Sequence, residues 1–315
     1  TVRQGAVMQK TKIIVVAGPT ASGKTALAVQ IAKAVNGEII SADSMQVYQG
    51  MGIATAAPTQ QEMQGVRHHL VQCLNRDVPF SAADFCRLAR SAVKDIASRG
   101  KVPVIAGGTG LFIDSLVDNV QFIETKSDDA LRARLMAKDT DELYDELLKA
   151  DPKAAAGIHK NNKKRVARAL EIYYLTGKTK SEADRDAVKE TSPYDTLYFV
   201  IEYQNRQILY DRINRRVDQM LANGLVEEAR RCLKTAGKTA AQAIGHKELQ
   251  PYFNGSAGLE EAAENIKRET RRYAKRQITW FKRRENAVRL VADAENADLV
   301  GDAVRISRDF LNGES

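Results

Sequence analysis

Short apolar runs recur along the chain and are separated by longer amphipathic segments. The main runs are continuous rather than alternating, which is typical of strands buried on both faces of a parallel sheet. Helical spacing of apolar residues between them predicts helices. A chain in which buried strands and helices alternate predicts an α/β fold. The predicted strands are residues 13–17, 38–41, 101–106 and 197–201.

The pattern of strands stops in the middle of the chain and charged, alanine-rich segments replace it. These segments predict helices at residues 129–138, 141–149 and 163–176. We therefore expect a helical insertion within one catalytic core. The insertion is predicted at residues 120–195 and the core at residues 10–119 and 196–315.

The first predicted strand leads directly into G-x-x-x-x-G-K-T, with Gly18, Gly23, Lys24 and Thr25 at the fixed positions. An apolar helical pattern follows. Glycines let backbone N–H groups turn inward, the helix N-terminus adds a positive dipole, and Lys24 adds a full charge. Because strand, glycine-rich turn and helix occur in the required order, we interpret residues 18–25 as a phosphate- or diphosphate-binding loop.

Two further turns follow predicted strands. In open parallel sheets the residues just beyond the strands line the ligand site, so Asp43 is expected beside the phosphate-binding loop. An aspartate there could equally be the N-cap of a following helix, and the sequence leaves both roles open. The predicted strand at 101–106 leads into Gly-Gly-Thr-Gly, residues 107–110. An ATP-hydrolysing protein would carry a magnesium-binding aspartate at such a strand end, so this turn argues against ATP hydrolysis.

A net charge of +8 favours a polyanionic partner. Nine cations and a single acid lie between residues 267 and 284, within a helix predicted at 259–284. Cations without local anions predict contacts with nucleic-acid phosphates, although a solvated helix face would also explain them. Tyr273 and Trp280 are seven residues apart and fit the buried stripe of this helix better than a base-stacking surface.

Other classes of protein are disfavoured. No apolar run reaches the ~18 residues that a membrane span needs, and the N-terminus lacks the apolar region of a signal peptide. The cysteines Cys73, Cys86 and Cys232 form no metal or disulfide pattern. His68 and His69 are adjacent, so on a strand they would face opposite sides, which argues against a shared metal. We expect a cytoplasmic, monomeric protein.

Together these motifs resemble the tRNA dimethylallyltransferase (tRNA isopentenyltransferase) family over nearly the whole chain. The resemblance implies a P-loop NTPase-like parallel-sheet core with an inserted helical subdomain. The chain departs from the family's pattern at Ala57, where lysine is frequent, and at His246, where tyrosine is common. The matching segments are GPTASGKTALA at 18–28, ISADSMQVYQGM at 40–51, HHL at 68–70, SAADF at 81–85, GGTGLF at 107–112, RVARALEIYYLTGK at 165–178, QAIGHKEL at 242–249 and RRYAKRQITWFKR at 271–283.

The family transfers the dimethylallyl group of dimethylallyl diphosphate to the N6 amine of the adenine on the 3′ side of the tRNA anticodon, and releases diphosphate. The resemblance implies that Asp43 accepts the proton of the amine as general base. It also implies that Lys24 and Thr25 stabilise the leaving group, with Thr25 contacting Mg²⁺. The target base would be flipped out of its stack. The positions implied to bind diphosphate are Gly18, Pro19, Thr20, Ala21, Ser22, Gly23, Lys24, Thr25, Arg212 and Arg216.

The resemblance also implies contacts with the anticodon stem-loop of tRNA. In the insertion, Arg165 and Arg168 share a helix face, which fits such a contact. The main alternative is a P-loop small-molecule kinase, with a hydroxyl-bearing substrate beside Asp43, but the basic C-terminal helix would have no use there. The positions implied to contact tRNA are Asp43, Ser44, Met45, Gln46, Thr109, Arg132, Lys164, Arg165, Arg168, Gln242, Gly245, Lys247, Lys275, Arg276, Gln277 and Trp280.

Overall fold

The computed structural model describes residues 10–122, 128–187, 191–295 and 297–314. Its sheet has six parallel strands in the order β3-β2-β4-β1-β5-β6. The predicted α/β fold with a parallel sheet is therefore confirmed. The short edge strands β3 and β6 were not predicted. The strands are β1 Thr11–Ala17, β2 Gly37–Ser41, β3 His68–His69, β4 Val102–Gly107, β5 Tyr194–Glu202 and β6 Val288–Val291.

Helices make up most of the remaining structure. In the core they are α1 Lys24–Ala34, α2 Gly52–Thr55, α3 Gln60–Met63, α4 Ala82–Ser98, α5 Gly110–Val117, α11 Arg206–Ala222, α12 Leu225–Cys232, α13 Gln250–Phe253, α14 Leu259–Phe281 and α15 Leu299–Asn312, with 3₁₀ turns η1 Ala240–Gln242 and η2 Lys247–Leu249. In the insertion they are α6 Asp129–Ala137, α7 Thr140–Ala150, α8 Pro152–Gly157, α9 Lys163–Thr176 and α10 Lys180–Ala187.

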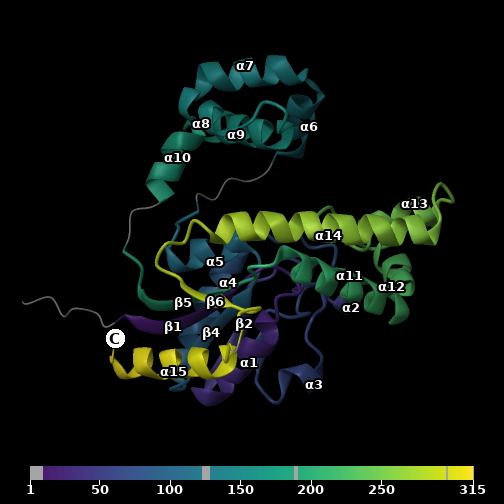
Figure 1. Ribbon diagram of the computed structural model, residues 1–315. Coiled ribbons are helices and arrows are strands. Elements are labelled where there is room, and N and C mark those ends of the chain that lie inside the picture. The colour runs from purple at the N-terminus through teal and green to yellow at the C-terminus, as the bar shows by residue number, and fades with distance from the viewer. Residues whose placement is uncertain (1–9, 123–127, 188–190, 296, 315) are drawn as a thin grey trace, which may run out of the picture. The chain divides into compact units, whose positions relative to one another are not determined.

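The central strands send successive side chains into two separate apolar cores. Ile13 and Val15 of β1 pack with residues of α4 and α5 on one face, and Ile14 and Val16 pack with residues of α1 and α15 on the other. Figure 1 shows these two helix layers on opposite sides of the sheet. Because both faces are covered, β1 is apolar throughout its centre, which is why its sequence is continuous rather than alternating.

Local capping signals set several helix ends. Ser81 and Asp84 form the capping box that begins α4. Asp151 and Pro152 begin α8, a helix that was not predicted, where proline occupies the first turn and Asp151 caps it. The basic helix α14 ends at Phe281, three residues before the expected end.

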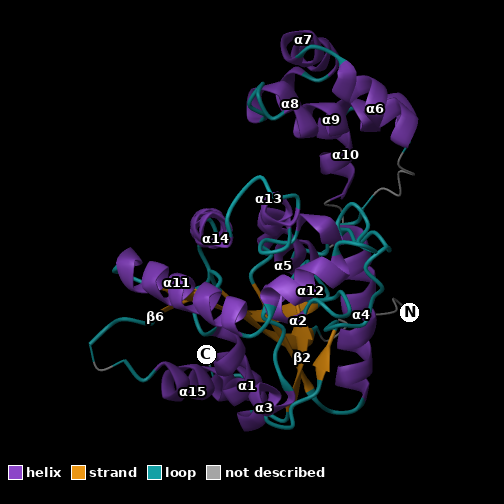
Figure 2. Cartoon of the chain, turned by 90° about the vertical axis from the view of Figure 1, so that its right-hand side faces the viewer, coloured by secondary structure: helices purple, strands orange, loops and turns teal. Residues whose placement is uncertain are grey.

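The chain separates into two compact units at Val117/Asp118 and Ser192/Pro193, close to the boundaries at 119/120 and 195/196 that the sequence suggests. Among its described residues the smaller unit consists of α6 to α10 and connecting turns (Figure 2). Leu135, Leu143, Leu147 and Leu170 centre its own apolar core. No helix in the described ranges is long and apolar enough to cross a membrane.

Candidate active site

The phosphate-binding loop connects β1 to α1 at the carboxyl edge of the sheet. Gly23 has φ 92° in the left-handed region, which suits glycine, and α1 begins at the next residue. A Cβ atom at Gly18 would lie 3.0 Å from the Ser22 Oγ and 3.2 Å from the Ile201 carbonyl oxygen. The backbone conformation of Gly23 therefore favours glycine, and a side chain at Gly18 would crowd Ser22 and the Ile201 carbonyl group. The N–H groups that begin α1 form the anion-binding end of the helix.

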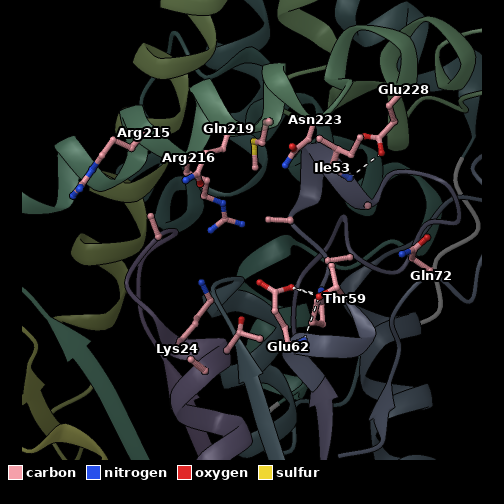
Figure 3. Close-up of a pocket in the computed structure, with 18 of the residues that line it drawn as sticks. Lys24, Ile53, Thr59, Glu62, Gln72, Arg215, Arg216, Gln219, Asn223 and Glu228 are labelled. Atoms are coloured by element: carbon pink, nitrogen blue, oxygen red, sulfur yellow. Dashed lines mark hydrogen bonds between the residues drawn. The ribbon is translucent and has the colours of Figure 1, made fainter. Parts of the chain in front are cut away.

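Lys24 lies at the start of α1, where its Nζ donates to the Pro19 carbonyl oxygen at 3.2 Å. Burial and the nearby Arg216 lower the pKa of Lys24 to about 8, while Asp43 acts in the opposite direction. Burial also lowers the pKa of Arg216, and again Asp43 opposes it. Figure 3 shows Lys24 and Arg216 pointing toward one another across a cavity. Two cations that repel each other in a partly buried space favour an anion between them.

This space, the loop cavity, has a volume of about 880 Å³ and extends from the phosphate-binding loop to α11 and residues 50–59. Arg212 Nε donates to the Ala21 carbonyl oxygen at 2.9 Å, so this arginine lies against the loop itself. Arg215 points away from the cavity centre in Figure 3. The resemblance implies diphosphate contacts for Arg212 and Arg216, and the structure brings both side chains to the loop cavity.

Asp43 follows β2 and caps a turn rather than the N-terminus of a helix. Its Oδ1 accepts from the N–H groups of Met45 at 2.9 Å and Gln46 at 3.3 Å. Asp43 also lines a second space of about 230 Å³, the Asp43 cavity, together with Thr20 of the phosphate-binding loop. The carboxylate therefore lies beside the loop. The neighbouring Ser44 N–H donates to Thr109 Oγ1 at 3.1 Å, which fixes the same turn.

In the Asp43 cavity α11 supplies mostly apolar side chains, whereas α14 supplies Ile266 together with Thr270, Tyr273 and Arg276. It shares Arg216 and Met220 with the loop cavity, so the two spaces adjoin along α11. Burial, followed by the charge of Asp43, raises the pKa of Tyr273, so this phenol stays protonated at neutral pH. The guanidinium of Arg276 lies 5.6 Å from the centre of the Tyr273 ring. Ile213, Val217, Ile244 and Ile266 supply apolar lining.

The turn after β4 allows two close approaches of backbone. A Cβ atom at Gly107 would lie 2.2 Å from the Ala42 carbonyl oxygen, and one at Gly110 would lie 2.2 Å from Trp280 Cδ1. The glycines therefore let the Asp43 turn and α14 pack directly on this turn. Trp280 Nε1 donates to Asp114 Oδ2 at 2.6 Å, so this indole, predicted both as apolar stripe and as tRNA contact, is anchored to α5.

Gln277 connects the two glycine-rich turns. Its Oε1 accepts from the Thr20 N–H at 2.8 Å, and its Nε2 donates to the Gly108 carbonyl oxygen at 2.8 Å. The side chain is buried. Gln277, expected at the tRNA surface, thus holds the phosphate-binding loop in place from α14.

The other expected tRNA contacts in the core divide into buried and exposed positions. Gln46 Oε1 accepts from Ser41 Oγ at 2.8 Å, and Gln46 Nε2 donates to the carbonyl oxygens of residues 55 and 56. Gly245 is buried with φ 101°, next to Leu225 and Ala54. By contrast, the side chains of Gln242, Lys247, Lys275 and Arg276 are exposed.

In the insertion unit, Lys164 and Arg165 are exposed near the start of α9. Arg132 and Arg168 instead approach the fully buried carboxylate of Glu171, at 2.7 Å and 3.0 Å. Burial raises the pKa of Glu171, but the hydrogen bonds from both arginines outweigh it, and the net pKa is lowered. Arg132 therefore joins α6 to α9, whereas Arg168 pairs with Glu171 within α9.

The histidine pair has protein partners. His68 Nδ1 lies 2.9 Å from the Val66 carbonyl oxygen, and His69 Nε2 lies 2.8 Å from Glu38 Oε2. Within the described ranges no three His, Cys, Asp or Glu side chains gather as a metal site. Mg²⁺ commonly binds through one or two protein oxygens and substrate phosphates, so the Thr25 hydroxyl beside the loop cavity fits that mode.

Sequence reasoning missed Glu228 and His246 as parts of the site. Glu228 lies in the charged segment LVEEARRC, which is typical of a solvated helix, yet it is buried next to the loop cavity. His246 Nε2 lies 3.0 Å from Glu228 Oε1. The departure from tyrosine was the only sequence signal at this place.

Comparisons with known proteins agree with this arrangement. The family model described as IPP transferase matches residues 46–284. A tRNA dimethylallyltransferase of Caldanaerobacter subterraneus subsp. tengcongensis is 46% identical over 279 residues, which cover 86% of this chain and 89% of that protein.

Solved structures agree as well. The full-length tRNA isopentenylpyrophosphate transferase of Bacillus halodurans superposes with a TM-score of 0.71 and 41% identity, covering 97% of both chains. A eukaryotic dimethylallyltransferase acting on tRNA gives a TM-score of 0.82 at 32% identity, covering 97% of this chain and 80% of that one. These matches support a prenyltransferase rather than a kinase. The chain belongs to the tRNA dimethylallyltransferase family of prenyltransferases.

Proposed function

We propose that the protein transfers a dimethylallyl group from dimethylallyl diphosphate to the N6 amine of the adenine 3′-adjacent to the tRNA anticodon. The observation that carries this proposal is the pair of adjoining cavities. One contains the phosphate-binding loop with Lys24 and Arg216, and the other contains Asp43. A diphosphate in the first and an adenine in the second would meet along α11.

The reaction then follows from the charges of the site. The bond between C1 of the allyl group and the diphosphate oxygen breaks, and C1 forms a bond to N6. Negative charge grows on the departing diphosphate, where Lys24, Arg212 and Arg216 stabilise it. Asp43 accepts the proton that N6 loses. Its Oδ1 is held by backbone amides, which fixes the orientation of the carboxylate beside the acceptor.

Mg²⁺ would be held by the Thr25 hydroxyl together with diphosphate oxygens, and when bound it would neutralise charge on the leaving group. The exposed cations of α14 and α9 would contact tRNA phosphates. Such a partner and substrate imply a cytoplasmic enzyme.

The test is to incubate the protein with unmodified tRNA and dimethylallyl diphosphate labelled in the allyl group. Label is expected on the tRNA, at one adenine beside the anticodon. Absence of label on tRNA would refute the proposal. If ATP and a hydroxyl compound reacted instead, the kinase alternative would replace it.

A further inference from the structure

The short helix α2 forms the wall between the two cavities. Gly52 and Ile53 of α2 line the loop cavity, and Ala54 and Thr55 line the Asp43 cavity. Any displacement of this wall changes how a ligand in one cavity approaches a ligand in the other. A helix of four residues has little stability of its own, so its placement depends on contacts from elsewhere.

The N-terminus of α2 is capped from a distant part of the chain. Met51 precedes the helix and provides no side-chain cap. Instead, Glu228 of α12 accepts from the Ile53 N–H at 2.8 Å and from the Ala54 N–H at 2.9 Å, one bond on each carboxylate oxygen. These N–H groups lack partners inside the helix and normally bind a capping side chain. The bond to Ile53 is visible in Figure 3.

The capping carboxylate is itself buried and held. Glu228 is 3% exposed, His246 is 0% exposed, and His246 Nε2 donates to the same carboxylate at 3.0 Å. Burial raises the pKa of Glu228, but the bonds from His246 and the two amides outweigh it, so the pKa is lowered and the group stays ionised at neutral pH. A buried carboxylate with three donors is a rigid anchor.

The other end of the wall is tied to the Asp43 turn. Gln46 Nε2 donates to the Thr55 and Ala56 carbonyl oxygens, each at 3.2 Å. The N–H of Gln46 is in turn held by Asp43 Oδ1. Hydrogen bonds therefore hold both ends of α2: Glu228 binds its N-terminus, and Gln46 of the Asp43 turn binds its C-terminal end.

We propose that Glu228, supported by His246, is a positioning residue for prenyl transfer: it fixes α2 so that the allyl carbon in the loop cavity and the amine in the Asp43 cavity meet in reactive geometry. This inference rests on the proposed function. Glu228 acts through the backbone of α2 and takes no proton in the reaction. Small misplacements of reacting groups can lower rates by about 10²-fold.

The decisive variant is Glu228→Gln, which replaces one acceptor oxygen by an NH₂ group that faces a backbone N–H. We expect kcat/KM for dimethylallyl diphosphate to fall about 10-fold or more, with tRNA affinity close to wild type. The backbone N–H that loses its acceptor also lowers the melting temperature, so the kinetics are measured at a temperature where circular dichroism shows the variant to be folded. Glu227→Gln is the matched control, because Glu227 is exposed and adjacent on the same helix. Wild-type kinetics in Glu228→Gln would overturn the proposal.

The His246 pair separates positioning from folding. His246→Phe removes the third donor to the Glu228 carboxylate. His246→Tyr carries the same six-membered ring as His246→Phe and adds a hydroxyl donor. We expect the tyrosine variant to recover the kcat that the phenylalanine variant loses, at equal melting temperatures. Equal kcat in both would refute the role of the donor, and this pair decides the matter if Glu228→Gln fails to fold.

Calorimetry of dimethylallyl diphosphate binding without tRNA gives a readout independent of turnover. Glu228→Gln should weaken this binding relative to Glu227→Gln even if the acceptor differs from tRNA. If the wild-type protein binds the diphosphate but prenylates no tRNA, the proposed function fails. If both Glu variants bind it with wild-type affinity, the proposed positioning by Glu228 fails.

Discussion

The lowered pKa of Lys24 leads to a quantitative prediction for diphosphate binding. In the protein without ligand, burial and Arg216 bring the pKa from 10.5 to about 8. About half of the Lys24 side chains are therefore neutral at pH 8. A diphosphate entering the loop cavity adds negative charge beside the amine, which opposes both causes of the shift and raises the pKa again. Binding must then take up protons.

The expected uptake follows from the titration of one group. It is about 0.1 proton at pH 7, about 0.5 at pH 8 and about 0.9 at pH 9, if the bound pKa returns to its ordinary range. The ligand contributes little, since phosphate groups are almost fully ionised above pH 8. Because binding takes up a proton, the affinity for dimethylallyl diphosphate should fall as the pH rises above 8, by at most about tenfold per pH unit.

Calorimetric titration of dimethylallyl diphosphate without tRNA, repeated in buffers of different ionisation enthalpy, measures the uptake directly. Lys24→Arg is the control, because arginine keeps its charge throughout this range and should bind without taking up protons. No buffer dependence in the wild-type protein at pH 8 to 9 would contradict the reasoning. So would an equal uptake in Lys24→Arg, which would assign the proton to another group.

Three further predictions test the site and the scaffold. Asp43→Asn keeps an Oδ1 acceptor for the capped turn, so tRNA affinity in filter binding should persist while single-turnover prenylation falls about 10²-fold or more. Gly110→Ala places a Cβ against Trp280 and should cost about 1–3 kcal/mol in urea unfolding, whereas the exposed Leu111→Ala should change stability little. The pKa of Glu171 is lowered from 4.5 in the folded protein. The ionised carboxylate therefore stabilises the fold above pH 4.5, and this stabilisation is lost as the pH falls through the folded pKa. Hydrogen exchange of the α9 amides should become faster over that pH range in the wild-type protein, and this pH dependence should be absent in Glu171→Gln.

Features encoded by neighbouring residues could be predicted from the sequence. The glycine loop is one of these, because Gly23 adopts its left-handed conformation for local steric reasons. The capping box of Ser81 and Asp84 is another, since both bonds span three residues. The apolar run of β1 indicated burial on both faces for the same reason. In each case the partner lies within a few residues or is the sheet itself.

Features that depend on distant partners could not be predicted. Gln277 binds Thr20 and Gly108, and Glu228 binds the backbone of residues 53 and 54, across separations of more than 160 residues. A glutamine or glutamate on a charged helix gives no periodic signal that distinguishes a buried partner from a solvated face. The edge strand β6 was missed because a four-residue segment with one charge has little apolar pattern.

The turn after β4 explains how a phosphate-binding fold can serve prenyl transfer. In nucleotide-hydrolysing relatives of this architecture an acid near that strand end holds magnesium. Here position 107 has no space for any side chain, because a Cβ would lie 2.2 Å from the Ala42 carbonyl oxygen. The same close approach lets the Ala42 N–H donate to the Ala106 carbonyl oxygen at 2.8 Å. It also lets the Thr109 N–H donate to the Ala42 carbonyl oxygen at 3.2 Å. The backbone that excludes an acid from β4 therefore fixes the turn that carries Asp43. In the proposed reaction the diphosphate departs intact, so a carboxylate is needed as a base beside the acceptor amine rather than as a magnesium ligand beside the phosphates.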